Sequence, residues 1–245
     1  MKKKINLLKT NTGKVITFIA IIPARGNSQR IKNKNMVNVN GKPLIYWTLK
    51  SALNSKYINN ICVTSDSKKI LDFCSKFQIK TILRPKKLSG NIIQPDEAIK
   101  HAYLKLKKKY DYIVMLQPTS PLRFSKDIDE AIETLINEKS KSLFSSSMQS
   151  SFIWKKNKKN LYPINYKVKN RPRSQDISFY CENGAIYITK SSLFLKEGVR
   201  LCGKISTYVM PNKRSVDIDD IDDLKKTEIF MKFSSEKFKK KNHYS

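Results

Sequence analysis

With 245 residues, 40% of them hydrophobic, the chain is long enough to bury a substantial core in one domain, which excludes general disorder. Its net charge of +29 comes from 41 lysines and only 8 arginines against 20 acidic residues, a balance that indicates a lysine-rich solvated surface rather than a nucleic-acid-binding protein. Four cysteines without a CxxC pair or a histidine cluster exclude the common zinc motifs and indicate a reduced, cytoplasmic protein.

The first predicted element is a buried strand near the N-terminus. A basic start, residues 1–14, precedes the apolar run VITFIAIIPA, and together they superficially resemble a signal peptide. The run is short, rich in Ile and Val, and continues into a polar loop, so we predict a strand. No segment approaches the roughly 18 apolar residues of a membrane span. We therefore expect no membrane association and a flexible basic tail at 1–14.

Strand and helix patterns then alternate along the chain. Apolar residues recur at helical spacing in GKPLIYWTLKSALNS, SKKILDFCSKF, QPDEAIKHAYLKLKKK and SKDIDEAIETLINEK. The intervening NNICVTSD, IKTILRP and YDYIVMLQPTSP are short apolar runs typical of buried strands. This alternation predicts a mostly parallel sheet with helices on both faces, whose ligands bind at the carboxyl ends of the strands.

The pattern changes after about residue 143. The stretch that begins SSSMQSSFIWKK has no helical period and is dense in Ser, Asn, Lys and aromatic residues, which is consistent with a β-rich insertion that makes a subunit contact. GAIYITK and STYVMP predict strands, and SVDIDDIDDLKKTEIFMKF predicts a final helix with an acidic start. We expect a single domain over 15–235, followed by a flexible basic tail at 236–245.

The polar loop from Ile21 to Asn35, IIPARGNSQRIKNKN, is the first candidate site. A strand that ends in Gly and Ser can turn sharply and present backbone N–H groups, and nearby cations neutralise phosphates. The loop matches neither the GxGxxG nor the GxxxxGK[ST] pattern. Two interpretations stay open: a polyphosphate clamp or a solvated surface loop. The cations of this loop are Arg25, Arg30, Lys32 and Lys34.

Two aspartates near the C-terminus are the second candidate site. In an extended segment Asp217 and Asp219 project on the same face, because side chains alternate with a period of two. Such a pair can hold Mg²⁺ together with substrate phosphates. The alternative is that the acids of RSVDIDDIDDL only favour a helix N-terminus.

The turn LQPTSPLR is the third candidate site. Its prolines stop both a helix and an inner strand, so Gln117, Thr119, Ser120 and Arg123 lie on a rigid polar turn. A rigid turn is suited to substrate binding, and a purely structural turn is the alternative.

Taken together, the motifs resemble one enzyme family. IIPARGNSQRIKNKN, GKPLIYWTL, VTSD, LRP, LQPTSPLR, RPRSQD, ENGAIYI and SVDIDDIDDL occur in the order expected of the CMP-sialic acid synthetases, the acylneuraminate cytidylyltransferases. The resemblance covers about Phe18 to Phe233. It implies a Rossmann-like fold of the nucleotide-diphospho-sugar transferase type and a homodimer formed through a β-rich excursion at 149–180.

The resemblance also implies a reaction and its residues. The reaction is transfer of CMP from CTP to the anomeric hydroxyl of a nine-carbon 2-keto sugar acid (a nonulosonic acid), with release of pyrophosphate and with Mg²⁺ as cofactor. The implied catalytic set comprises Arg25, Lys34, Asp217 and Asp219. The matched motifs also imply a role for each residue. The triphosphate would be held by Arg25, Ser28, Lys34 and Asn35, and Mg²⁺ by Asp217 and Asp219. Arg84 would lie near the cytosine, Gln117 would contact the sugar acid, and Arg173 would lie by the sugar or phosphate.

Two positions depart from the family pattern. Gln29 stands where a lysine is usual, with Arg30 as its candidate substitute, and Pro95 lies where the family has an acidic, serine-rich stretch beside the base. FIWKK and RPRSQD are most similar to the subgroup that uses animal sialic acid and bacterial legionaminic acid. The alternatives are pseudaminic acid or the eight-carbon 3-deoxy-octulosonic acid as substrate, an inactive synthetase, and a non-enzymatic basic protein that binds nucleic acid.

Overall fold

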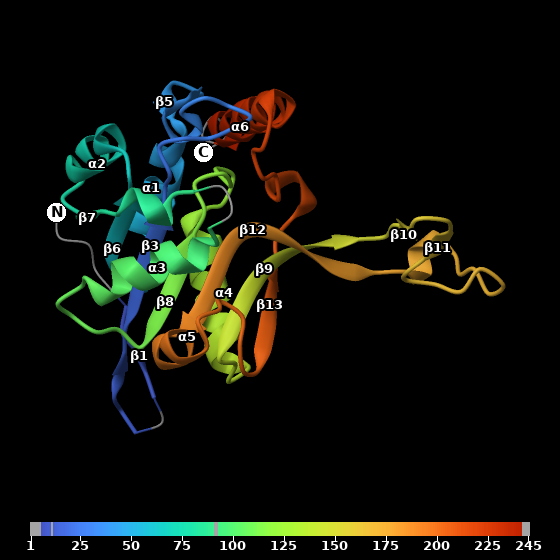
Figure 1. Cartoon of the computed structure of the whole chain (residues 1–245), viewed down its shortest axis with the longest axis horizontal. Helices are drawn as coiled ribbons and strands as arrows, with labels where there is room; N and C mark the ends of the chain where they lie inside the picture. The colour runs from blue at the N-terminus through green and yellow to red at the C-terminus, as the bar shows by residue number, and fades with distance from the viewer. Residues whose placement is uncertain (1–5, 11, 91–92, 242–245) are drawn as a thin grey trace.

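A seven-stranded sheet forms the centre of the molecule in the computed structural model, which describes residues 6–10, 12–90 and 93–241 (Figure 1). In sheet order the strands are β13 (Ile205–Val209), β9 (Ser142–Gln149), β12 (Phe179–Lys190), β8 (Tyr112–Leu116), β3 (Phe18–Pro23), β6 (Ile58–Ser65) and β7 (Lys80–Leu83). Strand β12 runs antiparallel to its neighbours β8 and β9, and the other six share one direction. The prediction of a mostly parallel α/β sheet is therefore confirmed.

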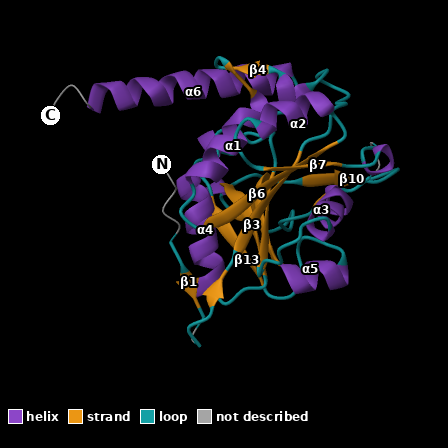
Figure 2. Ribbon diagram, turned by 90° about the vertical axis from the view of Figure 1, so that its left-hand side faces the viewer, coloured by secondary structure: helices purple, strands orange, loops and turns teal. Residues whose placement is uncertain are grey.

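Alternate side chains of the strands supply two cores, one on each face of the sheet. In β3, Ala20 and Ile22 belong to one core, whereas Ile19 and Ile21 belong to the other. The first face carries α1 (Leu44–Asn54), α2 (Lys68–Ser75) and α4 (Ser125–Asn137), and the second carries α3 (Pro95–Leu104) and α5 (Ser191–Glu197). Figure 2 shows α1 and α4 on one side of the sheet and α3 and α5 on the other. The predicted helical cover on both faces is confirmed.

The final helix, α6 (Ile221–Lys241), lies across one end of the sheet (Figure 2). Its Leu224 and Met231 pack against a small separate core that includes Ile218. The helix continues to Lys241, into the segment 236–245 that we expected to be a flexible tail. Residues 1–5, 11 and 242–245 of the two predicted tails lie outside the described residues. Within the described residues, no helix is both long and apolar enough to cross a membrane.

The N-terminal segment differs from the predicted single strand behind a tail. Leu8–Lys9 (β1) pairs with Val15–Ile16 (β2) in a hairpin, and β3 begins only at Phe18. Between them, the Thr17 backbone N–H and hydroxyl both donate to Asp111 Oδ2, at 2.9 and 2.8 Å. The apolar run could not reveal this break, because the partner of Thr17 lies 94 residues away.

Between β9 and β12 the chain leaves the sheet as an arm, residues 150–178, that projects from the body (Figure 1). The arm contains the hairpin of β10 (Trp154–Lys156) and β11 (Leu161–Pro163). It lies within 149–180, where we expected a β-rich excursion. The serine-rich sequence that starts near residue 143 begins before the arm, inside β9. The serines of β9 fit a strand because they are buried and their hydroxyls are hydrogen-bonded. Ser145 donates to Asn183 Oδ1 at 2.6 Å and accepts from the Ile186 N–H at 2.8 Å.

Short elements complete the fold around the ends of the sheet. A hairpin of β4 (Asn38–Val39) and β5 (Lys42–Pro43) leads into α1, and its turn residues Asn40 and Gly41 have φ of 49° and 81°, as a two-residue hairpin turn requires. The 3₁₀ helices are η1 (Lys34–Met36), η2 (Lys86–Leu88), η3 (Ser174–Asp176) and η4 (Asn212–Arg214).

Candidate active site

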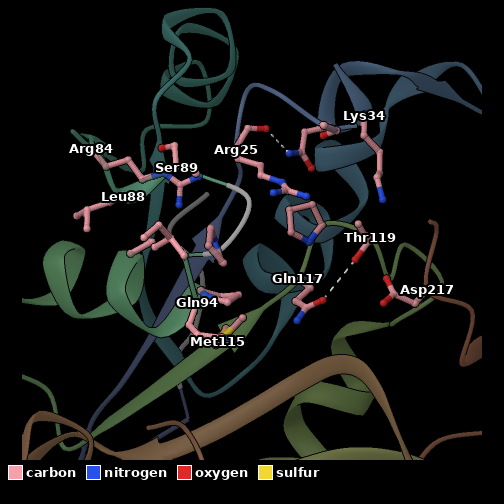
Figure 3. Close-up of a pocket in the computed structure, with 18 of the residues that line it drawn as sticks. Arg25, Lys34, Arg84, Leu88, Ser89, Gln94, Met115, Gln117, Thr119 and Asp217 are labelled. Atoms are coloured by element: carbon pink, nitrogen blue, oxygen red, sulfur yellow. Dashed lines mark hydrogen bonds between the residues drawn. The ribbon is translucent and has the colours of Figure 1, made fainter. Parts of the chain in front are cut away.

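The carboxyl ends of the parallel strands open into a cleft of about 410 Å³ (Figure 3). Figure 3 shows Arg84 and Ser89 on one side of it and Lys34 and Asp217 on the other. This is the edge at which a parallel α/β sheet binds its ligands. Of the nine predicted site residues, eight line the cleft: Arg25, Ser28, Lys34, Asn35, Arg84, Gln117, Asp217 and Asp219.

The first loop (residues 24–35) is held close to the end of β6. The Gly26 N–H donates to Asp66 Oδ1 at 2.8 Å, and a Cβ on Gly26 would lie 2.7 Å from Ser67 Cβ. A side chain at this position is therefore excluded. At the other end of the loop, Asn35 Nδ2 donates to the Arg25 carbonyl at 2.8 Å, so the Arg25 backbone is fixed where it enters the cleft.

Lys34 connects the first loop to the acidic segment (residues 215–223). Its side chain is only 11% exposed, and its Nζ donates to the Ile218 carbonyl at 2.7 Å and to Asp219 Oδ1 at 3.1 Å. Arg30 Nη1 lies 3.0 Å from Asp219 Oδ2 on the same carboxylate. The Asp219 charge is thus neutralised from two sides, and the loop and the acidic segment form one wall.

The acidic segment is also hydrogen-bonded to the polar turn after β8. The Ile218 N–H donates to the Thr119 carbonyl at 2.8 Å, and the Thr119 hydroxyl lies 3.5 Å from Gln117 Oε1 (Figure 3). Gln117 and Asp217 consequently face the same part of the cleft. Of the two alternatives for LQPTSPLR, this placement favours substrate binding over a purely structural turn.

Asp217 and Asp219 form a donor set that fits Mg²⁺. Although Asp217 as a whole residue is exposed, desolvation raises the pKa of its carboxyl group; a hydrogen bond from Thr119 opposes this shift, and the Asp219 charge adds to it. Proximity of a second carboxylate has this effect because two like charges repel, and a cation between them would relieve the repulsion. Within the described residues, no group of three or more His, Cys, Asp or Glu side chains could hold a metal. Mg²⁺ commonly takes only one or two carboxylates and completes its shell with water and phosphate oxygens, so two aspartates suffice.

The opposite wall of the cleft contains buried polar groups. The Arg84 side chain is 5% exposed and lies 3.7 Å from Asp66 Oδ1; burial lowers its pKa, which the Asp66 charge opposes and the Arg25 charge reinforces. Arg84 Nε and Ser89 Oγ are buried and have no hydrogen-bond partner among the described residues. Unsatisfied donors of this kind are costly unless a ligand pairs with them. Ser89 was missed in the sequence, although it follows the LRP motif by only a few residues.

The two family departures have different surroundings. Gln29 is exposed and is not among the residues of the cleft wall, whereas Pro95 lines the cleft at the first position of α3. A proline costs nothing at that position, because the backbone N–H it lacks would have no partner within the helix. That Arg30 replaces the usual lysine stays a prediction; the structure places it against Asp219.

Arg173 is the one predicted site residue outside the cleft. It lies on the arm, its side chain is 73% exposed, and its guanidinium binds Asp176 through Nε at 2.8 Å and Nη2 at 3.1 Å. The role expected for it at the sugar or phosphate is therefore not met within a single chain. The order of motifs could not show this, because the intervening chain departs from the sheet.

We expect Gly184→Ala to lower kcat/KM by about tenfold, because the new methyl group would crowd Gln117 and Asp217 in the cleft. Gly184 has φ +71°, and an added Cβ would lie 3.2 Å from Gln117 Oε1 and 3.4 Å from Asp217 Oδ2. Gly198→Ala is the matched control, since Gly198 has φ +76° and no atom within 4 Å of its added Cβ. Steady-state kinetics on both variants would separate crowding from backbone strain. Equal losses of activity in the two would contradict the prediction.

Comparison with known proteins identifies relatives over most of the chain. The family model described as cytidylyltransferase matches residues 19–241. A pseudaminic acid cytidylyltransferase of Campylobacter jejuni is 32% identical over 228 residues, which is 89% of this chain and 97% of that protein. N-acylneuraminate cytidylyltransferase A of Danio rerio is 33% identical over 209 residues, which is 83% of this chain but only 48% of the fish protein. The chain therefore spans nearly all of the bacterial relative and about half the length of the fish relative.

A solved structure supports the fold at lower sequence identity. A CMP:2-keto-3-deoxy-manno-octonic acid synthetase, solved in complex with CTP, superimposes with a TM-score of 0.68 at 16% identity, over 89% of this chain and 99% of that one. At this identity the similarity concerns the arrangement of the sheet and helices. It confirms the Rossmann-like architecture that the family resemblance implied.

Proposed function

We propose that this chain, which belongs to the cytidylyltransferase family, transfers CMP from CTP to the anomeric hydroxyl of a nine-carbon 2-keto sugar acid and releases pyrophosphate. The chain is a nucleotidyltransferase, as its family and its named relatives are. The observation that carries the proposal is the single cleft that joins the cationic first loop, the aspartate pair and Gln117. These are the parts that phosphoryl-group transfer to a polar acceptor needs.

In the proposed reaction, the sugar hydroxyl oxygen attacks the α-phosphorus of CTP. The new bond joins that oxygen to the α-phosphorus, and the proton of the hydroxyl passes to water or to a carboxylate of the cleft. The bond between the α-phosphorus and the bridging oxygen to the β-phosphorus breaks, and its electron pair leaves with pyrophosphate. Arg25 and Lys34 line the cleft together with Ser28 and Asn35, and we propose that the two cations neutralise the triphosphate. Orientation in line and stabilisation of charge account for such catalysis without a covalent enzyme intermediate.

Asp217 and Asp219 are the residues proposed to hold Mg²⁺. When bound, the ion would supply neutralising charge to the phosphate oxygens and to the departing pyrophosphate. Asp219 also pairs with Lys34 and Arg30, so the carboxylate that would hold the ion contacts two cations of the first loop.

The test of the proposed function is pyrophosphate release with CTP and Mg²⁺ across a panel of sugar acids. The panel contains N-acetylneuraminic, legionaminic, pseudaminic and 3-deoxy-octulosonic acids, with ATP, GTP and UTP as controls. We expect release with CTP and a nine-carbon acid; the names of the relatives support both sialic and pseudaminic acids as candidates. Silence with every acid from folded protein, or activity with the eight-carbon acid alone, would refute the proposal.

We also propose that the chain forms a homodimer through the arm. Apolar side chains are exposed along the arm and at its root, where a second copy would cover them. They are Trp154, Leu161, Tyr162, Ile164, Val168 and Tyr180. A dimer would also offer a second surface to Arg173, which does not line the cleft of its own chain.

We expect Leu161→Lys combined with Val168→Lys to convert the dimer to a monomer in analytical ultracentrifugation. These side chains are 61% and 62% exposed, so the substitutions should cost the isolated chain little stability, while charge would disfavour an apolar interface. Val199→Lys, at an exposed position of the body, is the control. A wild-type monomer, or an unchanged dimer in the double variant, would contradict this mode of association.

A further inference from the structure

The largest fully buried side chain of the described residues is a cation, Arg123, at 1% exposure. Burial lowers its pKa to about 9, and the charge of Asp127 opposes the shift. Across the described residues no carboxylate forms an ion pair with the Arg123 guanidinium. A buried charge is expensive unless hydrogen bonds satisfy it.

The guanidinium of Arg123 is held by four hydrogen bonds from three directions. Nη1 donates to the carbonyls of Ala185, at 2.7 Å, and Gln117, at 3.2 Å. Nη2 donates to Thr48 Oγ1 at 2.7 Å, and Nε lies 3.4 Å from Ser51 Oγ. Arg123 therefore connects the end of β8, the middle of β12 and helix α1. Only a planar fork with five donors can span such a set, and a lysine cannot.

Two of these contacts lie directly behind the cleft. Gln117, labelled in Figure 3, presents its side chain to the cleft, while its carbonyl on the other side accepts from Arg123. Ala185 follows Gly184, where an added Cβ would meet both Gln117 Oε1 and Asp217 Oδ2. The same Gln117 carbonyl also accepts from Thr48 Oγ1 at 3.3 Å. Arg123 and Thr48 thus fix the backbone from which the acceptor side of the cleft is built.

We propose that Arg123 is a positioning residue for the acceptor substrate: through the Gln117 and Ala185 carbonyls it sets the distance between the Gln117 side chain and the Gly184 backbone. It touches neither substrate. The inference rests on the proposed function, because it assumes that Gln117 meets the sugar acid. The nucleotide side of the cleft, formed by Arg84 and the first loop, has no direct hydrogen bond to Arg123 among those of the described residues, and its affinity for CTP should not depend on it.

The test uses Arg123→Lys and the nearly isosteric Thr48→Val in the 245-residue chain. We expect Arg123→Lys to lower kcat/KM for the sugar acid by about 10- to 100-fold, because a misplacement of about 1 Å has effects of this size. Thr48→Val should act in the same direction by about threefold to tenfold, and the double variant should lose less than the product of the two effects. The dissociation constant for CTP, from calorimetry, should stay within about twofold of wild type. Ser55→Ala, which removes a buried 2.6 Å hydrogen bond to Asp129 at the end of α1, controls for destabilisation alone.

A purely structural role would change the active fraction without changing the KM for the acid. Two kinetic results would overturn the proposal: wild-type kinetics for the acid in folded Thr48→Val, or equal losses of affinity for the acid and for CTP. If Arg123→Lys does not fold, Thr48→Val decides alone.

Hydrogen exchange supplies a readout that does not need activity. The amides of Gln117, Thr119, Ser120 and Leu122, and those of 183–186, should exchange faster in Thr48→Val than in wild type, with β3 and β6 unchanged, and equal exchange would overturn the proposal. An inactive wild-type enzyme with altered exchange in Thr48→Val would refute the proposed function while supporting the positioning.

Discussion

Asp219→Ala is expected to lower kcat by at least about 10³-fold while the protein stays folded, because it removes a proposed Mg²⁺ ligand and no core contact. The Asp219 side chain is 55% exposed, and Lys34 keeps its hydrogen bond to the Ile218 carbonyl when the carboxylate is gone. Exposed ion pairs contribute about 0–1 kcal/mol, so the loss of the Arg30 pair should change the free energy of unfolding little. Pyrophosphate release over a Mg²⁺ titration, with a thermal melt, measures both quantities.

Asp222→Ala is the matched control for this prediction. Asp222 belongs to the same run of acids but is 79% exposed, pairs with Lys225 at 3.6 Å and does not line the cleft. It should retain wild-type kcat within about twofold. If Asp219→Ala kept near-normal activity at every Mg²⁺ concentration, the metal assignment would be wrong. If both variants lost activity equally, the effect would belong to the start of α6 rather than to a metal.

Arg25→Ala is expected to raise the KM for CTP and lower kcat, each by about tenfold or more, because a charge that faces the triphosphate contributes in both the ground state and the transition state. Arg25 lines the cleft next to Arg84, and its charge contributes to the lowered pKa of Arg84. Its backbone is fixed by Asn35, so the loop should keep its course without the side chain. Initial rates with CTP varied at saturating acid measure the two constants.

Lys32→Ala controls for the loss of one positive charge from the same loop. Lys32 is exposed and does not line the cleft, so its replacement should change both constants by less than about twofold. An effect of Arg25→Ala on the sugar acid alone would mean that the first loop serves the acceptor. Equal effects of the two variants would indicate general attraction of the nucleotide, which added salt would weaken.

Much of the candidate site could be predicted because its residues occupy short local motifs. In a parallel sheet the residues after each strand meet at one edge, so recognising the strands was enough to bring Arg25, Arg84 and Gln117 together. The aspartates of VDID followed from their spacing and from the family resemblance. The position of Arg173 could not be predicted in this way, because it lies on an arm whose direction no local sequence pattern determines.

Partnerships across the chain could not be predicted in the same way. Lys34 was expected to serve the triphosphate, and the structure adds its bond to Asp219, 185 residues away. Arg123 was noted only as part of a polar turn, whereas it is the largest fully buried side chain. Arginine is usually exposed to solvent, so nothing in the sequence was a reason to expect a buried one. In the interior, the surrounding carbonyls and hydroxyls satisfy its guanidinium.

By itself the sequence determined the alternation of strands and helices, the mostly parallel sheet, the edge of the sheet where the candidate site lies and the cytidylyltransferase family, because hydrophobic period and motif order are properties of the sequence itself. The tertiary structure alone decided which polar groups face one another. It placed Lys34 against Asp219, Arg123 behind Gln117, and Arg173 on the arm outside the cleft. The physical reason is that hydrogen bonds and ion pairs depend on distances of a few ångströms between residues far apart in the chain, which folding of the whole sheet sets.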